Sequence, residues 1–447
     1  MPVRLIDSLA TTAPLAEIFS DEQILQAMLD FEAALARAEA RVDVIPLAAA
    51  DAIANAARAD GFDVAKLSSE TLRAGTPAIP VVKTLTERVR ASDPDAARFV
   101  HWGATSQDVT DTALVLLLAR ARKILAADHA RLIQALRTLA QKHQRTVMLG
   151  RTLLQPAPPV TFGLKAAGWL AAVRRGWNRI DTRISEAAML QFGGASGTLA
   201  ALGDKGDAVG QALATDLGLR YPDAPWHTHR DSLAAMLAAC GVQCGSLGKM
   251  ARDIALLMQG EVAEAAEPSG DGRGGSSTMP HKRNPVACSL TLAAAHRVPG
   301  LLASFLSAML QEHERGAGGW QAEWPIIGSI IQATGLAVAS MAEAAEGLTV
   351  DKTRMLANIQ ATGGNIFAER VMMLLGATLG RDVAHKLLEE ATHKSAAERR
   401  RLVDVLAEMP EITRVIPVAT LSNLDSPEDY LGMAATFQKR LLTPPER

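Results

Sequence analysis

Apolar residues recur at helical spacing over long stretches of this chain. Between Pro225 and Pro268 there is no proline, and the apolar positions lie three and four residues apart: Leu233, Met236, Leu237, Cys240, Cys244, Leu247, Met250, Ile254, Leu257 and Met258. An α-helix turns once in about 3.6 residues, so this spacing places them on one face. The pattern predicts one long helix with a wide buried face.

Three further segments are expected to form long helices: residues 108–142, residues 286–314 with a kink near Pro299, and residues 326–356. A helix over most of 225–268 would be about 50 Å long, at about 1.5 Å per residue. No Asn-Gly or Asp-Gly hairpin signal with flanking alternation stands out. The sequence therefore predicts an all-α fold built around a bundle of long helices.

The helical patterns become shorter at both ends of the chain. Before about residue 110 they alternate with Pro and Gly breaks such as Gly75-Thr76-Pro77, and they shorten again after Gly363-Gly364. A chain of 447 residues is also too long for one ordinary core. We therefore expect three helical domains, at residues 1–110, 111–362 and 363–447.

Composition and charge limit the partners that are expected. The chain is 48% hydrophobic and 4% aromatic, with a formal net charge of -2 and both signs interspersed. Such a charge creates no field that attracts nucleic acid or an anionic membrane, so a small molecule is the expected partner. The N-terminal residues show no secretion or transit signal, and the uncharged stretch 326–342 is interpreted as a buried helix rather than a membrane span. These features predict a cytoplasmic protein.

The three cysteines, Cys240, Cys244 and Cys288, fit a reducing compartment without a disulfide framework. Cys240 and Cys244 lie four residues apart on an apolar face, and no His or acidic residue completes a set of metal ligands. Core packing is therefore preferred over metal binding for this pair. We expect neither a metal nor a cofactor.

A glycine-rich stretch before a helix start carries the candidate chemistry. Residues 268–275 have high backbone freedom, and a loop of this kind can close over a site. Ser276 and Ser277 follow, and Lys282 and Asn284 stand before Pro285, which suits the first turn of a helix. A hydroxyl, a cation and an amide beside a helix start could deprotonate a carbon next to a carboxylate and hold the resulting charge. Judged from the residues alone, a flexible linker with capping serines explains the stretch equally well.

Two other regions contain residues suited to binding an anion. Thr105 and Ser106 stand at the expected start of the helix over 108–142, where free N–H groups favour a carboxylate. Ser106 and Asp108 could also simply cap that helix, and capping is preferred for Asp108. Arg151 could donate two hydrogen bonds to a carboxylate, and Gln155 could hydrogen-bond the same carboxylate. A lone Arg before a turn is, however, usually only a surface charge.

The run Gly275-Ser276-Ser277-Thr278-Met279-Pro280-His281-Lys282-Arg283-Asn284-Pro285 matches every fixed position of the pattern that marks the fumarase and aspartase superfamily. Residues 101–108, His-Trp-Gly-Ala-Thr-Ser-Gln-Asp, resemble the first motif of that superfamily, and residues 150–163 resemble its second motif. The resemblance covers essentially the whole chain. The resemblance therefore favours an active site over a flexible linker as the interpretation of the glycine-rich stretch.

The resemblance implies roles for individual residues. Ser276 takes the role of general base, and Lys282 and Asn284 bind a substrate carboxylate. Further substrate contacts are expected from His101, Thr105, Ser106, Arg151, Gln155, Ser277, Met279 and, in the stretch 314–324, Arg315. The resemblance also implies a homotetramer in which the long helices of four chains form one core and each active site takes motifs from different subunits.

The chain departs from the superfamily pattern at Leu153. Relatives that release an amine commonly have a His at this position as part of the general acid. The stretch 74–81 also lacks the second catalytic His of adenylosuccinate lyases. His101 and His281 could substitute as acids, but neither occupies either of these two positions. A carboxylate leaving group needs no such acid, because its conjugate acid has a pKa of about 4. Within the superfamily, the resemblance then implies the branch whose leaving group is a carboxylate, a lactone-forming cycloisomerase that acts on a muconate tricarboxylate.

Two alternatives remain open at this point. One is an adenylosuccinate-type or argininosuccinate-type lyase that uses a different acid. The other is a non-catalytic structural relative, whose mark would be the loss of the motif serine, whereas Ser276 is present.

Overall fold

The computed structural model describes residues 5–270, 274–275, 279 and 282–443. The described residues are predominantly helical, which confirms the all-α prediction. They form two compact units, each assembled from three stretches of chain. The first comprises Met1–Ala130, Arg175–Gly248 and Leu290–Ser340, and the second comprises Arg131–Arg174, Lys249–Ser289 and Met341–Arg447. The division into three domains stays a prediction.

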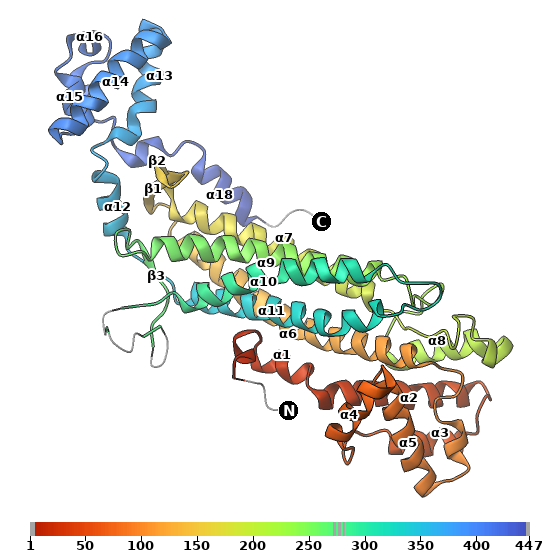
Figure 1. Ribbon diagram of the computed structural model, residues 1–447. Coiled ribbons are helices and arrows are strands. Elements are labelled where there is room, and N and C mark those ends of the chain that lie inside the picture. Colours follow the sequence, from red (N-terminus) through yellow and green to blue (C-terminus); the bar gives the residue numbers. More distant parts are fainter. Residues whose placement is uncertain (1–4, 271–273, 276–278, 280–281, 444–447) are drawn as a thin grey trace. The chain divides into compact units, whose positions relative to one another are not determined.

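The first unit contains the N-terminal helices (Figure 1), with the bounds α1 (Ala13–Ile18), α2 (Asp21–Arg41), α3 (Leu47–Ala56), α4 (Val64–Ala74), α5 (Ala78–Ser92) and α8 (Gly206–Leu217). Local sequence explains several of their ends. The Ser20 hydroxyl accepts a hydrogen bond from Gln23 N–H at 3.3 Å and the Asp63 carboxylate accepts one from Lys66 N–H at 3.0 Å, so both helices start on a side-chain cap. Gly75, with φ of +71°, ends α4 in the left-handed conformation that glycine tolerates best.

Five long helices contribute residues to both units: α6 (Ser106–Lys142), α7 (Phe162–Ala187), α9 (Asp231–Leu257), α10 (Val286–Ala308) and α11 (Gly319–Glu346). The predicted helix at 108–142 is confirmed almost to the residue. The helix predicted between Pro225 and Pro268 is also present but shorter, because α9 ends at Leu257. The sequence interpretation missed α7, and it placed the fourth helix at 326–356, whereas Gly347 follows the end of α11.

Small residues allow the long helices to approach closely within the first unit. A Cβ added at Gly248 of α9 would lie 2.7 Å from the Cβ of Ala295 in α10, a distance that real side chains do not adopt. Cys240 and Cys244 of α9 are fully buried, and the Cys244 sulfur lies 3.4 Å from the Thr334 hydroxyl of α11. Among the described residues no group of three or more His, Cys, Asp and Glu side chains is placed to hold a metal ion.

Three of the described helices are long and apolar enough to cross a membrane when judged by length and composition alone: α9, α10 and α11. In α11 the most apolar window is 72% buried inside the protein, and Ile327, Ile330 and Ile331 are completely inaccessible. The prediction of a buried helix at 326–342 is therefore confirmed. In α10 only 28% of the corresponding window is buried, and the exposed positions of this helix are mostly small or polar residues such as Ser289, Arg297 and Ser304.

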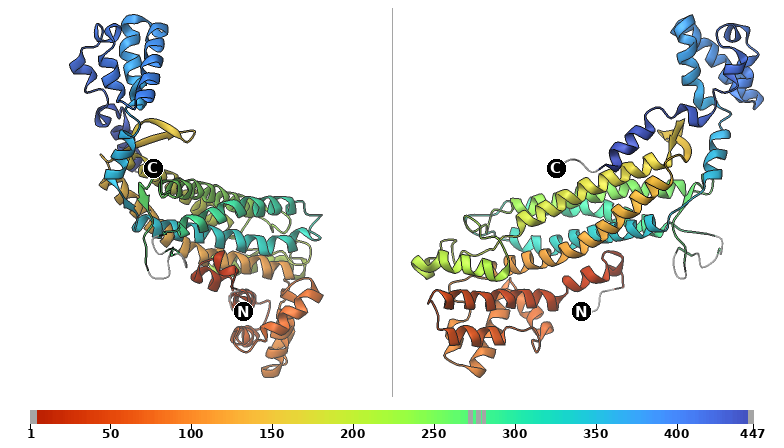
Figure 2. Two further views of the ribbon diagram at one scale, coloured as in Figure 1. Left: turned by 60° about the vertical axis from the view of Figure 1, so that its left-hand side comes forward. Right: turned by 180° about the vertical axis from the view of Figure 1, so that it is seen from behind.

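The second unit adds small strands and short helices, with the bounds β1 (Val147–Thr152), β2 (Gln155–Thr161), β3 (Ala265–Ala266), β4 (Thr349–Val350), α12 (Lys352–Gln360), α13 (Ala368–Leu379), α14 (Arg381–Glu398), α15 (Leu402–Ala407), α16 (Pro410–Thr413), α17 (Val418–Leu421) and α18 (Ala434–Leu442). Helices α13 to α17 enclose a core of their own, which includes Leu375, Leu388 and Leu406, and the views in Figure 2 show these helices gathered together.

The hairpin of β1 and β2 forms although no Asn-Gly or Asp-Gly signal marks it in the sequence. Its two-residue turn consists of Leu153 and Leu154, with φ of +50° and +65°, and their exposed fractions are 97% and 76%. Two-residue turns with both residues at positive φ usually contain Asn-Gly or Asp-Gly. Two leucines give no such signal and adopt this conformation at a cost of roughly 1–2 kcal/mol each, which is why the sequence pattern did not predict it.

Glu39 of α2 provides a test of the electrostatics of the first unit. Burial, assisted by the charge of Glu32, raises the pKa of Glu39 from 4.5 to about 9. The unfolded chain releases this proton near its ordinary pKa, so folding takes up a proton between pH 4.5 and about 9 and the free energy of unfolding falls as the pH rises. Because Gln is neutral at every pH, Glu39→Gln is expected to raise the free energy of unfolding by on the order of 3 kcal/mol at pH 7.

Urea unfolding at several pH values measures this effect. The difference between variant and wild type should shrink toward pH 5 and grow toward pH 9. A difference that does not change with pH would show that Glu39 is ionised in the folded protein.

Candidate active site

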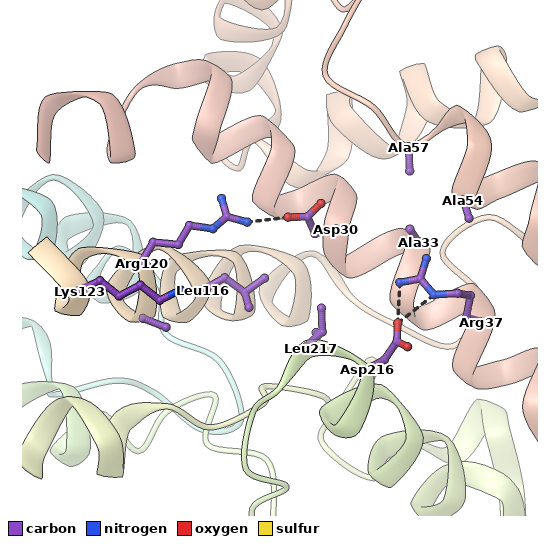
Figure 3. Close-up of a pocket in the computed structure, with 11 residues that line it drawn as sticks. Asp30, Ala33, Arg37, Ala54, Ala57, Leu116, Arg120, Lys123, Asp216 and Leu217 are labelled. Atoms are coloured by element: carbon purple, nitrogen blue, oxygen red, sulfur yellow. Dashed lines mark hydrogen bonds and ion pairs between the residues drawn. The ribbon is translucent and has the colours of Figure 1, made fainter. Parts of the chain in front are cut away.

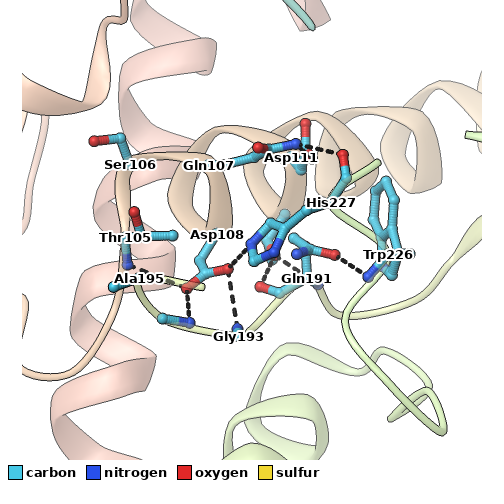
Figure 4. Close-up of polar contacts among 12 residues, drawn as sticks. Thr105, Ser106, Gln107, Asp108, Asp111, Gln191, Gly193, Ala195, Trp226 and His227 are labelled. Atoms are coloured by element: carbon cyan, nitrogen blue, oxygen red, sulfur yellow. Dashed lines mark hydrogen bonds and ion pairs between the residues drawn. The ribbon is translucent and has the colours of Figure 1, made fainter. Parts of the chain in front are cut away.

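Asp108 organises the start of α6 in the first unit. Its carboxylate accepts hydrogen bonds from the backbone N–H groups of Thr105 at 3.1 Å, Gly193 at 3.1 Å and Gly194 at 2.9 Å, and from His227 Nε2 at 2.8 Å. Figure 4 shows these contacts converging on Asp108. The bond to Thr105 caps the helix start, which confirms the capping role, and the other three bonds hold segments that are distant in sequence.

Thr105 and Ser106 therefore stand on a rigid support. The N–H groups in the first turn of an α-helix have no partner inside the helix, and α6 is 37 residues long. Ser106 begins the helix, and its carbonyl accepts a hydrogen bond from the Thr110 hydroxyl at 3.0 Å. The predicted anion-binding role of Thr105 and Ser106 fits this geometry and stays a prediction.

One turn further along α6, Asp111 belongs to a buried network of charges that the sequence interpretation missed. Arg230 is completely buried and donates to Asp111 at 2.7 and 3.1 Å and to Glu323 of α11 at 2.9 and 2.7 Å. Burial alone would lower the pKa of Arg230, but the charges of Asp111 and Glu323 outweigh it and raise the pKa. The guanidinium also stacks on Trp226, 4.8 Å from the ring centre, and Trp320 donates to Asp111 at 3.0 Å.

The predicted carboxylate contact Arg315 binds backbone in the first unit. Its guanidinium donates to the carbonyl oxygens of Gly194 at 2.7 Å and Ala195 at 3.1 Å. Asp108 holds the N–H groups of this segment while Arg315 holds its carbonyls, so both residues fix residues 193–195. A substrate contact by Arg315 stays a prediction.

His101 is also in the first unit, four residues before Thr105. Its Nδ1 lies 2.6 Å from a carboxylate oxygen of Glu32 in α2. The Glu32 side chain is completely buried, whereas the His101 side chain is 20% exposed. A predicted substrate residue is thus joined to a buried acid that no sequence motif had indicated.

In the second unit, the predicted substrate residue Arg151 pairs with Glu264. Its two terminal nitrogens donate to the two Glu264 carboxylate oxygens at 2.9 and 2.7 Å, and Asn358 donates to the same carboxylate at 2.7 Å. Glu264 is completely buried, so this pair anchors the hairpin that carries Arg151. A contact between Arg151 and a substrate would require this fork to open or to be shared, and it stays a prediction. Gln155 is exposed where β2 begins, opposite Thr152.

Arg151 and Asn358 also line a cavity of about 530 Å³ in the second unit, together with Leu149, Pro156, Glu261, Val262, Ala361, Thr362, Asn365 and Ile366. This volume lies within the usual range of small-molecule sites. The side-chain oxygen of Asn365 is buried there without a hydrogen-bond donor among the described residues. The cavity therefore offers an acceptor, whereas the guanidinium that lines it is already paired with Glu264.

A second cavity, of about 510 Å³, lies in the first unit and is lined by charged residues that are largely committed to each other (Figure 3). Arg120 pairs with Asp30 at 2.7 Å, and Arg37 donates to Asp216 at 2.9 Å. These pairs neutralise most of the charge at this cavity. Like the cavity beside Arg151, it therefore offers little uncommitted positive charge for a substrate with several carboxylates.

The signature run lies in the second unit and is described only in part. Ser276 and Ser277 fall outside the described residues, so their roles stay predictions. The Lys282 side chain is exposed. The backbone N–H of Lys282 donates to the carbonyl of Met279 at 3.0 Å, and the backbone N–H of Asn284 donates to the carbonyl of Gly274 at 2.9 Å.

Glu267 secures the two ends of this loop. Its buried carboxylate accepts hydrogen bonds from the N–H groups of Ala287 at 3.0 Å and Cys288 at 2.8 Å, at the start of α10. A carboxylate at this position is stabilised by the helix dipole. The last residue before the loop is thus fastened to the first helical turn after it.

The structure therefore groups the predicted residues in two sets. His101, Thr105, Ser106 and Arg315 belong to the first unit, and Arg151, Gln155, Met279, Lys282 and Asn284 belong to the second. Sequence reasoning missed Glu32, Asp111, Arg230, Glu264 and Glu323. Glu32, Asp111 and Glu323 lie on helices, whereas Arg230 and Glu264 do not, so no single periodic pattern marks these five residues.

Two family models match this chain. Residues 9–300 match the family described as Lyase, and residues 364–441 match the family described as Adenylosuccinate lyase C-terminus. The chain therefore belongs to the lyase family of the fumarase and aspartase superfamily, as the signature run predicted.

Within this superfamily the chain is similar to several 3-carboxy-cis,cis-muconate cycloisomerases along nearly its whole length. It is 47% identical to the cycloisomerase of that name from Bradyrhizobium diazoefficiens, over 99% of this chain and 98% of the relative. The crystal structure of 3-carboxy-cis,cis-muconate lactonizing enzyme from Pseudomonas putida has a TM-score of 0.93 at 45% identity, with 98% of each chain covered. A nitrosuccinate lyase from Streptomyces davaonensis is 41% identical over 99% of this chain and 95% of the relative.

Proposed function

We propose that this chain is an isomerase that interconverts 3-carboxy-cis,cis-muconate and its carboxymuconolactone. The observation that carries the proposal is the full-length similarity, at 43–47% identity, to several relatives with this activity in their names. The activity belongs to the protocatechuate branch of the beta-ketoadipate pathway, which degrades aromatic compounds.

The residues of the signature run supply the chemistry. In the lactone direction one substrate carboxylate adds to a double bond, and the carbanion that forms beside another carboxylate takes up a proton. Ser276 gives that proton in this direction and removes it in the reverse direction. A serine hydroxyl is a weak base in water, so it must act as an alkoxide that nearby donors stabilise.

Lys282 and Asn284 hold the carboxylate that carries the developing negative charge. A cation and an amide donor stabilise this charge most strongly when water is excluded from the site. The remaining carboxylates are assigned to Thr105 and Ser106 at the start of α6, and to His101, Arg151 and Arg315. Gln155, Ser277 and Met279 complete the contacts to the substrate.

The position of Leu153 supports a leaving group that needs no acid. The structure places this side chain at the exposed tip of the β1 and β2 hairpin, where an aliphatic group has no proton to give. An amine that departs without a general acid would be slowed by roughly 10² to 10⁴-fold. A carboxylate departs as a stable anion, so a leucine at position 153 does not slow a lactone-forming enzyme.

Assays of purified protein with three substrates test the proposal. We expect rapid conversion of 3-carboxy-cis,cis-muconate, and little or no cleavage of adenylosuccinate or nitrosuccinate. Nitrosuccinate is included because the lyase of that name is 41% identical to this chain. Efficient cleavage of either alternative substrate, with the muconate left unchanged, would contradict the proposal.

The same family membership supports a self-assembling cytoplasmic enzyme, proposed to be a homotetramer without nucleic-acid or membrane partners. Helix α10 is apolar overall but only 28% of its most apolar window is buried on the single chain, so association of several chains would bury more of it. The chain has a mass of 47.3 kDa, so sedimentation distinguishes a tetramer from a monomer directly. Sedimentation as a monomer at micromolar concentration would contradict the assembly.

A further inference from the structure

The contact between His101 and Glu32 has features that simple packing does not require. The two side chains meet at 2.6 Å, and Glu32 is completely buried on α2, 69 positions away in sequence. Burying a carboxylate is unfavourable unless a partner compensates for the lost water. For one of the two Glu32 oxygens, Oε1, His101 is that partner, whereas the other has no hydrogen-bond partner among the described residues.

The backbone of His101 is strained as well. Its φ of +60° lies in the left-handed region, which costs a residue with a side chain on the order of 1–3 kcal/mol. Such strain persists where the surrounding structure holds the residue in place, and it is found most often at functional positions. Here the strained residue lies directly before the segment that starts α6.

Hydrogen-bond chemistry restricts the form of the imidazole. A carboxylate accepts, so the Nδ1 of His101 must carry a proton when Glu32 is ionised. The neutral ring then has a bare Nε2, and only the charged ring carries a second proton there. The ring can therefore donate through Nε2 to a substrate carboxylate only as a cation.

We propose that Glu32 is a positioning residue that holds His101 as a charged Nε2–H donor for a substrate carboxylate at the start of α6. This inference rests on the proposed function and on the predicted role of His101 as a substrate contact. Glu32 itself does not touch the substrate.

The charges near His101 fit this role. Burial alone would lower the pKa of His101, but the charge and hydrogen bond of Glu32, and then the charge of Asp108, raise it above 6.5. Glu39, seven residues after Glu32 on α2, has its own pKa raised to about 9 and is neutral at pH 7. On α6, Asp108 pairs with His227. Of these three acids, Glu32 is the one whose carboxylate contacts the ring, at 2.6 Å.

Two variants that change a buried acid to its amide separate positioning from packing. Glu32→Gln removes the charge and keeps the size, so the pKa of His101 should fall by one unit or more. KM for the muconate should then rise about tenfold near pH 7.5 and recover at pH 5.5, with kcat changed less than threefold, because one pKa unit corresponds to a tenfold change in protonation. Glu39→Gln, a matched control on the same helix, should leave the KM profile unchanged.

A titration of His101 by NMR, with selectively ¹³C-labelled histidine, tests the pairing without reference to turnover. The signal is assigned from its loss in His101→Gln. An unchanged His101 pKa in Glu32→Gln would overturn the inference. If the pKa falls but the protein does not convert the muconate, the proposed function fails while the pairing stands.

The pH dependence also identifies a purely structural role. A KM that is raised equally at pH 5.5 and 7.5 in Glu32→Gln would overturn the inference. If Glu32→Gln does not fold, Glu32→Asp is the second variant, because it keeps the charge on a shorter side chain. In Glu32→Asp the pKa of His101 should stay mostly raised. A His101 pKa that falls to the value of a free histidine in this variant would contradict the proposal.

Discussion

Ser276→Ala is expected to lower kcat for the muconate by roughly 10² to 10⁴-fold without changing the stability of the protein. The alanine cannot exchange a proton with the carbon next to the carboxylate, whereas Lys282 and Asn284 still bind that carboxylate. KM should therefore change much less than kcat. Steady-state kinetics measure both constants, and circular dichroism with thermal unfolding checks the fold.

Ser269→Ala is the matched control for this prediction. Ser269 belongs to the same glycine-rich stretch but precedes the signature run, so its loss should leave kcat within about twofold of the wild type, as expected for a surface substitution. Near-normal turnover in Ser276→Ala would remove Ser276 from the role of base. An equal loss in both variants would point to the loop as a whole.

Arg230→Met is expected to give the largest loss of stability, about 3–5 kcal/mol in the free energy of unfolding. The substitution leaves Asp111 and Glu323 buried without the cation that offsets their charge. It also removes the guanidinium that stacks on Trp226. Urea unfolding monitored by circular dichroism measures the loss.

The control for Arg230→Met is Arg37→Met, in which the lost arginine pairs with Asp216 and its side chain is 41% exposed. An exposed ion pair contributes about 0–1 kcal/mol, so this variant should be nearly as stable as the wild type. Replacing Asp111 and Glu323 by their amides in the Arg230→Met background should recover part of the stability. A loss below about 1 kcal/mol in Arg230→Met would show that water reaches the network.

Several elements of the fold could be predicted because their signals are local. The helix at α6 follows from an uninterrupted apolar period, and its start from the Thr-Ser-x-Asp segment, whose Asp108 accepts from the N–H of Thr105. The break at Gly75 is equally local, because left-handed backbone favours glycine at that point. The signature run was recognisable because it is continuous in sequence.

Other elements depend on contacts that no local pattern encodes. The hairpin at Leu153 and Leu154 forms although neither leucine favours positive φ, and Arg151 on β1 is fixed through the distant Glu264. Tertiary contacts therefore compensate for an unfavourable turn. The helix α7 was overlooked because its start, Phe162, directly follows β2.

By itself, the sequence determined the helical class and the superfamily, since these depend on periodicity and on contiguous residues, and the chemistry of the run around Ser276 stays a prediction. Only the tertiary structure decided which buried charges face each other. Glu32 pairs with His101 across 69 positions, and Arg230 pairs with Asp111 across 119 positions. Such pairs leave no periodic trace, because the cost of burying each charge is offset only once folding has brought its partner within hydrogen-bonding distance.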